Sequence, residues 1–448
     1  MHIAILGNGI SGITAARHIR KLSKHDITVI SAESDYFFSR TALMYIYMGH
    51  MRLKDTQPYE NWFWEKNRIQ LKKAWIESVN FAQKHLITAS GEQINYDKLI
   101  LGVGSAPNKF GWPGQDLERV NGLYTLQDLS AMEDATQEGI ERAVVVGGGL
   151  IGIEMAEMFH SRDIPVSLLV REESYWNQVL PPEESAMVNR EIKRHGIDLR
   201  LDTELKEIID DGSGKACAVI TKDGERIDCQ YVGLTAGVHP NIDFLQETEL
   251  ETQKGILVDE FLQTNLPDVY AIGDCAQLRS PRSGRKAIEA VWYTGRMMGE
   301  VAAYNVCGQE IAYDPGIWFN SAKFMDIEYQ VYGDVQAQAP EAHRQLYWEH
   351  PEDRKSIRII YHAESKATIG FNLMGVRYRH QVCEKWMEEA VPIEEVLQQL
   401  SLANFDPEFY QTFEKKVVQQ YNQQNGTQIQ LKKKRKLKQV LRFLGSSG

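Results

Sequence analysis

The residues His2-Ile-Ala-Ile-Leu-Gly-Asn-Gly-Ile-Ser-Gly12 join an apolar run to a glycine-rich turn, and Ala143-Val-Val-Val-Gly-Gly-Gly-Leu-Ile-Gly152 repeats this arrangement. In each copy the alternation of a strand gives way to the spacing of a helix at the glycines, and a second apolar strand follows. We therefore predict two βαβ units. Their expected elements are a strand over 2–6, a helix to about Leu22 and a strand over 27–31, then a strand over 143–146, a helix to about His160 and a strand over 166–170.

Each glycine of such a turn has a separate task when a dinucleotide binds. The first permits the tight turn, the second lets the backbone approach the pyrophosphate, and the third allows the helix to pack closely on the strand. The helix N-terminus then offers N–H groups and the positive end of its dipole to the phosphates. The predicted phosphate contacts are Gly7, Asn8, Gly9, Ser11 and Gly12 in the first turn, and Gly147, Gly149, Leu150, Ile151 and Gly152 in the second.

Charged residues after the second strand of each unit are candidates for ribose recognition. An acid about 20 residues beyond the glycines binds ribose hydroxyls in such units, and Glu33 fits this position. In the second unit the strand is followed by Arg171 and Glu172. An acid suits the free 2'-hydroxyl of NADH, whereas an arginine suits the 2'-phosphate of NADPH. The coenzyme preference therefore stays open, with Glu172 favouring NADH.

Length and composition narrow the class of protein. A chain of 448 residues exceeds one hydrophobic core, so two or three domains are expected. The net charge is -11 although the segment 432–442 is strongly basic, and an acidic body is not typical of a nucleic-acid-binding fold.

No apolar run approaches the roughly 20 residues that cross a bilayer, and the N-terminus lacks a secretory signal, so we expect a cytoplasmic protein. The five cysteines form no CxxC or metal-type pair, so we expect a reducing compartment and no metal.

Three motifs in a fixed order carry a family resemblance. The two glycine turns are followed by TNLPDVYAIGDCA (residues 264–276), and together they resemble the pyridine nucleotide–disulfide oxidoreductase superfamily over about residues 1–309. The resemblance implies that the first turn holds FAD, that the second holds NAD(P)H, and that Asp274 hydrogen-bonds the ribityl chain. YDKLILGVGSAP (residues 96–107) looks like the family's segment beside FAD. The further residues assigned to the cofactors are Ile76, Val103, Gly104, Gly237, Gly273 and Trp292. For Trp292, packing in the core is an equal alternative.

Within the superfamily the sequence is most similar to rubredoxin and ferredoxin reductases and to the flavin part of assimilatory nitrite reductases. These proteins carry a lysine or arginine close to the flavin, and Phe38-Ser39-Arg40-Thr41 matches that segment. The resemblance makes Arg40 and Glu154 the catalytic candidates, with Glu154 beside the nicotinamide and paired with Arg40. A cation near the isoalloxazine favours the anionic reduced flavin. The alternative is a solvent-facing Arg40 and a helix-stabilising Glu154.

A missing cysteine narrows the chemistry further. Disulfide reductases of this superfamily place cysteine within the segment that corresponds to residues 39–43, and this chain has none there. Cys275 adjoins Asp274 and is interpreted as a packed small residue. We therefore expect electrons to leave from the flavin itself, without a thiol relay.

The predicted fold class is α/β, with two Rossmann-like dinucleotide-binding domains and a C-terminal α+β domain. Antiparallel strands are expected over 329–335, 357–362 and 367–374, with helices after them. Leu437, Val440, Leu441 and Leu444 share one face of a basic amphipathic helix, which suits an anionic membrane surface or an acidic partner; a solvated, disordered end is the alternative. The expected boundaries are 1–118 and 236–312 for the FAD domain, 119–235 for the NAD(P) domain, 313–421 for the interface domain and 422–448 for the tail.

The leading functional hypothesis is an enzyme that transfers a hydride from NAD(P)H to FAD and then passes electrons to a protein carrier. That carrier is a rubredoxin, a ferredoxin or an iron–sulfur partner. A second hypothesis, an NADH:quinone reductase held at the inner face of the membrane, is favoured by the basic tail and not by the Arg40 segment. A third is a non-catalytic flavoprotein that senses NAD(H). The sequence does not decide the electron acceptor or the oligomeric state, and a homodimer is one of the alternatives.

Overall fold

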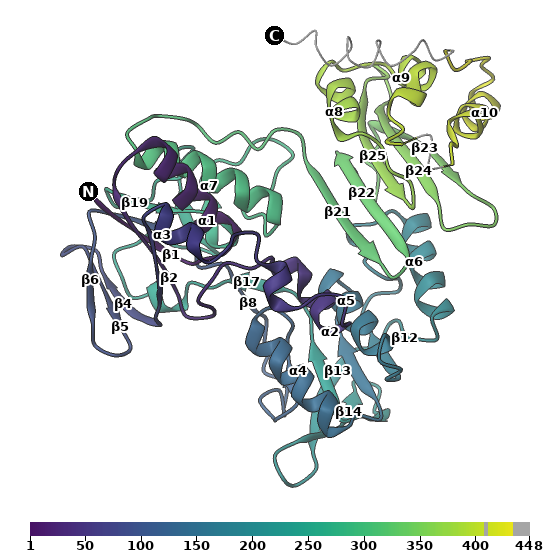
Figure 1. Ribbon diagram of the computed structural model, residues 1–448. Coiled ribbons are helices and arrows are strands. Elements are labelled where there is room, and N and C mark those ends of the chain that lie inside the picture. The colour runs from purple at the N-terminus through teal and green to yellow at the C-terminus, as the bar shows by residue number, and fades with distance from the viewer. Residues whose placement is uncertain (407–410, 433–448) are drawn as a thin grey trace. The chain divides into compact units, whose positions relative to one another are not determined.

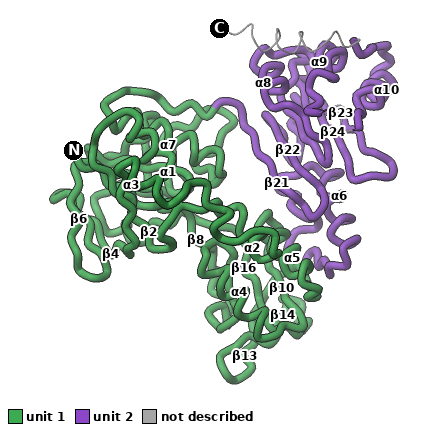
Figure 2. The backbone as a smooth tube through the Cα atoms, in the orientation of Figure 1, with its two compact units in different colours: residues 1–169, 204–315 green, residues 170–203, 316–448 purple. Residues whose placement is uncertain are grey.

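The structure is a computed structural model that describes residues 1–406 and 411–432, and it divides into two compact units (Figure 2). Unit 1 consists of residues 1–169 and 204–315, and unit 2 of residues 170–203 and the described part of 316–448. No helix within the described ranges is both long enough and apolar enough to span a membrane. The amphipathic face predicted for Leu437, Val440, Leu441 and Leu444 lies outside the described residues.

The first sheet of unit 1 is parallel, and its central strands are buried. Its order is β19 (Val269–Ala271), β7 (Lys98–Leu101), β1 (His2–Leu6), β2 (Asp26–Ser31) and β3 (Ile69–Lys73). Helices α1 (Ile10–Leu22) and α7 (Trp292–Val306) pack together so closely that a Cβ on Gly299 would lie 2.3 Å from the carbonyl oxygen of Ser11 (Figure 1). Because parallel strands are covered by helices, they need apolar side chains on both faces. The continuous apolar run of β1 follows from this burial, and the first predicted βαβ unit is confirmed.

The second sheet of unit 1 repeats this arrangement. Neighbouring parallel strands are β11 (Val166–Leu169), β10 (Ala143–Val146), β16 (Tyr231–Leu234) and β9 (Val120–Asn121). Helix α5 (Leu150–His160) follows β10 and ends at His160, as predicted. Helix α4 (Leu126–Glu138) begins at a capping box in which Thr125 and Asp128 satisfy each other's backbone N–H groups. The second βαβ unit is therefore confirmed as well.

Short elements connect and border these two sheets. The helices are α2 (Leu43–Tyr47) and α3 (Trp62–Lys66). The strands pair as β4 (Ile76–Asn80), β5 (His85–Thr88) and β6 (Gln93–Asn95), as β13 (Leu205–Asp210), β14 (Ala216–Thr221) and β15 (Arg226–Asp228), as β17 (Val238–Pro240) with β8 (Ser105–Pro107), and as β18 (Ile256–Val258) with β20 (Ala276–Leu278). Single turns of 3-10 helix include η1 (Arg40–Ala42), η2 (Leu53–Thr56), η3 (Asp243–Leu245) and η4 (Gly273–Cys275).

Unit 2 is built on an antiparallel sheet. Its order is β21 (Phe319–Phe324), β22 (Ile327–Gly333), β25 (Thr368–Met374), β24 (Ser356–His362) and β23 (His343–Glu349). The predicted antiparallel strands and the helices after them are confirmed. The helical elements of unit 2 are α6 (Pro182–Arg194), α8 (His380–Glu388), α9 (Ile393–Gln399), η5 (Leu400–Leu402) and α10 (Glu414–Asn425), and its remaining strand is β12 (Asp198–Arg200).

The predicted fold class is confirmed, since two parallel α/β sheets are followed by an α+β region. The expected boundaries place residues 170–203 in the NAD(P) domain. In the structure these residues, which include α6, form part of unit 2 with the C-terminal sheet (Figure 2).

Candidate functional site

The outer glycines of both turns are required by the protein's own packing. Gly7 has a φ of 115°, and a Cβ there would lie 2.1 Å from the carbonyl oxygen of Gly102. A Cβ on Gly12 would lie 2.0 Å from the carbonyl oxygen of Gly7. Gly147 and Gly152 repeat this pattern, because their Cβ atoms would lie 2.5 Å from the Thr235 oxygen and 2.2 Å from the Gly147 oxygen. Any side chain at these four positions would collide with backbone.

The middle glycines are different. A Cβ on Gly9 or Gly149 would have no other heavy atom of the described residues within 4 Å, apart from its chain neighbours and its own helix. Both residues are N-caps, of α1 and α5 respectively, and neither helix start has a side-chain cap. Helix N-termini of this kind bind anions, since their first N–H groups lack partners within the helix. Each middle glycine therefore leaves open space beside a helix N-terminus, and its contact with a phosphate stays a prediction.

The Gly-Asp motif and the first turn lie together. Gly273 of η4 is so close to Ser11 that a Cβ there would lie 2.8 Å from the Ser11 hydroxyl. A Cβ on Gly295, in the first turn of α7, would lie 3.5 Å from the side chain of Ile10. Trp292 is the first residue of α7, and it is partly buried. The structure thus brings the first turn, Asp274 and the start of α7 to one place.

Asp274 is partly buried and lies beside two hydroxyl groups. The Ser105 hydroxyl donates to Asp274 Oδ2 at 3.1 Å, and the Tyr124 hydroxyl donates to the same atom at 3.4 Å. Tyr124 also accepts a hydrogen bond from the Ser105 N–H at 2.9 Å. Burial raises the pKa of the Asp274 carboxyl above its usual range and raises the pKa of Tyr124 to about 12, so the phenol stays protonated. Gly104 borders this group, since a Cβ there would lie 2.9 Å from the Tyr124 hydroxyl.

Arg40 has a different partner from the one predicted. Its guanidinium donates to both carboxylate oxygens of Glu33, at 2.9 and 2.6 Å, and to the carbonyl oxygen of Tyr124. The guanidinium carbon also lies 4.6 Å from the centre of the Tyr124 ring. Within the described residues, no ion pair joins Arg40 to Glu154, so the predicted Arg40–Glu154 pair is wrong. Glu33 is nearer because it lies seven residues away in the same loop.

Glu33 also contacts the segment that leads into α4. Its Oε1 atom accepts from the Leu126 N–H at 2.9 Å, at the first residue of that helix. Its backbone carbonyl accepts from the Gln127 side chain at 3.1 Å. A carboxylate oxygen has two acceptor sites, so Glu33 retains capacity for a ribose hydroxyl. Its assignment to the ribose stays a prediction.

Glu154 lies on α5, two residues beyond the third glycine of the second turn. Burial raises the pKa of its carboxyl to about 7, and the negative charge of Glu157 adds to this effect. A carboxyl group with this pKa changes charge near neutral pH. The charge of Glu154 therefore depends on the pH.

The remaining predicted residues lie at several places. Ile76 is a buried residue of β4 in the core of unit 1. Val103 is partly buried in the loop after β7, and Gly237 borders the Asn108 side chain, whose Nδ2 would lie 3.1 Å from its Cβ. In unit 2, Arg171 donates to Glu172 Oε1 at 2.7 Å, so both candidates for ribose recognition are adjacent and paired. The pair leaves the choice between NADH and NADPH open.

All five cysteines, which lie within the described residues, are free thiols. Cys275 is fully buried, and its sulfur lies 3.3 Å from the carbonyl oxygen of Ile272 and 3.5 Å from that of Leu101. Burial raises the pKa of Cys275 to about 12, so the thiol is neutral and unreactive. This environment is that of a packed small residue, which agrees with its interpretation from the sequence.

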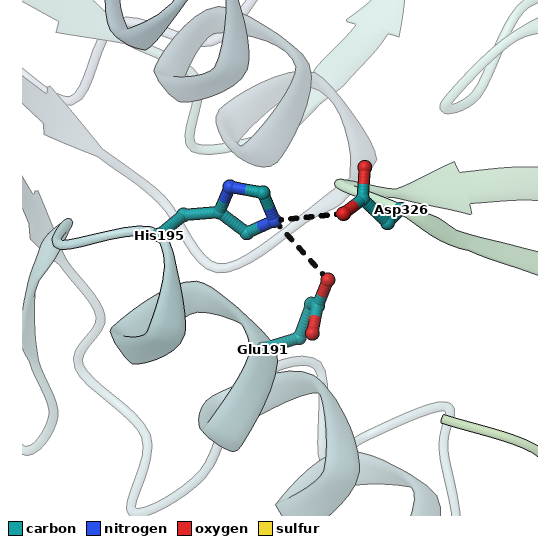
Figure 3. A group of neighbouring side chains, drawn as sticks. All are labelled: Glu191, His195 and Asp326. Atoms are coloured by element: carbon teal, nitrogen blue, oxygen red, sulfur yellow. Dashed lines mark hydrogen bonds and ion pairs between the residues drawn. The ribbon is translucent and has the colours of Figure 1, made fainter. Parts of the chain in front are cut away.

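One group in unit 2 has the composition of a metal site. Figure 3 shows His195, whose Nε2 lies 3.2 Å from Glu191 Oε1 and 3.3 Å from Asp326 Oδ2. Arg194 and Arg354 bind these same two oxygens at 2.8–2.9 Å. Two guanidinium charges repel a cation and already occupy the carboxylates. We therefore assign no metal to this group.

Sequence reasoning missed Tyr124, and it did not single out Ser105 within the segment 96–107 that resembles the family's segment beside FAD. Neither belongs to a glycine turn or to the Gly-Asp motif, and Tyr124 reaches the site from a loop 150 residues before Asp274. Replacing Tyr124 by phenylalanine should leave the Ser105 N–H without its acceptor and destabilise the flavin-free protein by about 1–2 kcal/mol. Urea denaturation of the apoprotein measures this change. An unaltered midpoint would show that water replaces the phenol at no cost.

Two glycine turns at helix N-termini, one of them near a partly buried aspartate and an arginine, form the arrangement expected of a protein that holds two dinucleotides. The family model for pyridine nucleotide-disulphide oxidoreductase matches residues 1–299. The chain belongs to this family. The predictions of the superfamily, of an oxidoreductase and of FAD with NAD(P)H as its cofactors are thereby confirmed.

Individual relatives agree with this assignment. The chain is 29% identical over 341 residues to an NADH-rubredoxin oxidoreductase of Clostridium acetobutylicum, and the match covers 75% of this chain and 83% of that protein. It is 28% identical over 310 residues to the assimilatory nitrate reductase electron transfer subunit of Bacillus subtilis, but the match covers 68% of this chain and 39% of that protein. A solved NAD-dependent persulfide reductase from A. fulgidus has a TM-score of 0.83, 21% identity, and coverage of 95% of this chain and 84% of that one. This last likeness shows the fold alone.

Proposed function

We propose that the protein oxidises NAD(P)H with FAD and delivers the electrons to a small protein carrier of the rubredoxin or ferredoxin kind, or to an iron–sulfur partner. The observation that carries this proposal is the group of Arg40, Glu33, Tyr124 and Asp274 beside the first turn, with no cysteine in the segment 39–43. Without a thiol pair, electrons leave from the flavin itself. The names of the two bacterial relatives, a rubredoxin oxidoreductase and an electron transfer subunit, support a protein acceptor.

The residues divide between the two nucleotides. When bound, FAD supplies a group that takes up two electrons from NAD(P)H and releases them singly. The N–H groups at the start of α1 would bind the FAD pyrophosphate, Asp274 would accept a ribityl hydroxyl, and Arg40 would keep a positive charge near the ring. For FAD we propose Gly7, Asn8, Gly9, Ser11, Gly12, Glu33, Ile76, Val103, Gly104, Gly237, Gly273 and Trp292, and for NAD(P)H we propose Gly147, Gly149, Leu150, Ile151, Gly152, Arg171 and Glu172.

Anaerobic reduction tests the proposal directly. The purified protein is loaded with FAD and mixed with NADH and separately with NADPH, and the loss of the flavin absorbance is followed. The reduced protein is then titrated with rubredoxin, ferredoxin and a quinone analogue, with and without anionic vesicles. Rapid reoxidation by one iron–sulfur carrier is expected. A flavin that neither nucleotide reduces would refute the proposal, and reoxidation by the quinone alone would favour the membrane-surface reductase.

The charge of Glu154 predicts a pH dependence of coenzyme binding. Its pKa of about 7 makes the carboxyl neutral in acid and anionic in alkali. Oxidised nicotinamide is cationic and reduced nicotinamide is neutral, so ionised Glu154 should favour NAD+ over NADH. The ratio of the two affinities should shift toward NAD+ by about fivefold between about pH 6 and about pH 8, as for an ion pair of about 1 kcal/mol. Titrations of both nucleotides check this, and the Glu154→Gln variant should show no such shift.

A further inference from the structure

A buried ion pair joins α6 to the sheet of unit 2. The Arg358 guanidinium on β24 donates to both carboxylate oxygens of Glu184 on α6, at 2.8 and 2.7 Å, and both side chains have no exposed surface. Asn372, which lies on β25 opposite Arg358, donates to Glu184 Oε1 at 3.1 Å. The Tyr347 ring lies 4.4 Å from the guanidinium carbon. A bidentate pair with these extra partners fixes both the position and the rotation of the helix.

The next residues of α6 hold the loop that precedes it. Ser185 is fully buried, and its hydroxyl lies 2.6 Å from both the Tyr175 carbonyl oxygen and the Ser174 hydroxyl. One turn further on, Asn189 accepts from the Tyr175 N–H at 3.0 Å and donates to the Ser174 hydroxyl at 2.8 Å. The loop therefore takes its conformation from α6.

The same loop contains the two residues proposed to meet the coenzyme ribose. Hydrogen bonds hold both the backbone and the side chain of Glu172. Its carbonyl accepts from the Asp202 N–H at 3.0 Å, and its carboxylate accepts from the Gln178 side chain at 3.0 Å. Trp176 then packs against the rings of Phe324 and Tyr329, at 5.5 and 5.9 Å between centres. These rings belong to β21 and β22 of the C-terminal sheet, so the loop and the sheet are joined twice.

We infer that Arg358 is a positioning residue for the pyridine nucleotide: through Glu184 and α6 it sets the loop 171–176 that receives the adenosine ribose. This inference rests on the proposed function, which assigns Arg171 and Glu172 to that ribose. Arg358 touches no coenzyme itself, since it is wholly buried. Through Arg358, the C-terminal sheet influences the affinity for the coenzyme, in addition to the contribution of the second glycine turn.

The consequence of removing Arg358 follows from burial. A carboxylate that loses its buried partner has no solvent to replace it, so Glu184 should leave the interface and move the N-terminus of α6. Ser185 and Asn189 would carry the loop with them. Arg358→Lys keeps the charge but lacks the planar fork, and it should give a milder form of the same defect.

The test compares Arg358→Gln, Arg358→Lys and a matched control in the full-length, FAD-loaded protein. The control, Arg190→Gln, removes an ion pair with Glu349 from the same helix at a position where 59% of the arginine side chain is exposed. Two reductants are used, NADH and reduced nicotinamide mononucleotide, which lacks the adenosine half. For Arg358→Gln the KM for NADH should rise about tenfold or more, as when a charged hydrogen bond is lost, while kcat/KM for the mononucleotide stays at the wild-type value.

Each outcome decides between the alternatives. The inference stands if NADH binding weakens, mononucleotide turnover and flavin content persist, Arg358→Lys is intermediate and Arg190→Gln is normal. It is overturned if both reductants lose activity in parallel, since Arg358 would then only stabilise the fold, or if the KM for NADH does not change. If NADH fails to reduce the wild-type protein, the proposed function itself is wrong, and this result is distinct from a failure of the inference.

Discussion

Replacing Gly9 by valine should give a protein that folds normally and contains no flavin. The backbone at Gly9 is extended, with φ of -69°, so valine is sterically allowed there. Its side chain would enter the open space beside the α1 N-terminus, where no other described residue comes within 4 Å of a Cβ. Absorbance spectra should show no bound FAD, whereas the apoprotein should unfold within about 0.5 kcal/mol of the wild type.

Gly149→Val is the matched experiment in the second turn. Its backbone is also extended, with φ of -107°, and the space beside it is equally open. This variant should keep its flavin, which dithionite still reduces, but kcat/KM for NADH should fall by roughly a hundredfold, equivalent to about 3 kcal/mol of lost binding. Stopped-flow reduction measures the change.

The outer glycines supply the control for both variants. Gly12→Val and Gly152→Val would place a side chain about 2 Å from a carbonyl oxygen, so these variants should misfold rather than lose one ligand selectively. If Gly9→Val kept its flavin and Gly149→Val lost it, the two nucleotides would be assigned to the wrong turns. If both variants bound both nucleotides, neither turn would hold a phosphate.

The two βαβ units were predictable from the sequence because their signals are local. A glycine that packs against backbone, as Gly12 does, has to occur at a fixed distance from its strand and helix. The apolar runs of β1 and β10 reflect burial on both faces, which leaves little room for polar residues. For these reasons the expected helix ends at Leu22 and His160 agree with the structure.

The partners of individual side chains were not predictable in the same way. The sequence analysis paired Arg40 with Glu154, whereas the observed partner, Glu33, depends on how one loop folds back on itself. Tyr124 reaches Asp274 from a distant loop, and Glu184 pairs with Arg358 across 174 residues. No periodicity or motif encodes such contacts, because they depend on how separate elements pack.

Asp274→Asn should have opposite effects on stability and on flavin binding. Burial raises the pKa of Asp274 in the folded apoprotein, so ionisation of this carboxyl opposes folding. The folded state holds the proton more tightly than the unfolded state does. The stability of the apoprotein should therefore decrease as the pH rises from the ordinary pKa of an aspartate to the raised one, and stay lower above it. Asparagine removes this cost, so the apo variant should be more stable than the wild type at neutral pH.

Flavin binding should change in the other direction. An ionised Asp274 accepts a ribityl hydroxyl through a charge-assisted bond worth about 1.5–3 kcal/mol, so its loss should weaken FAD binding by roughly 10- to 150-fold. Fluorescence titration of FAD and urea denaturation of the apoprotein measure both effects, with Cys275→Ala, which alters the adjacent buried side chain, as the control. A variant that lost both stability and flavin would mean that Asp274 mainly supports the fold through Ser105 and Tyr124. A gain in stability with a loss of affinity would show that the carboxylate is kept, at a cost to folding, for its ligand.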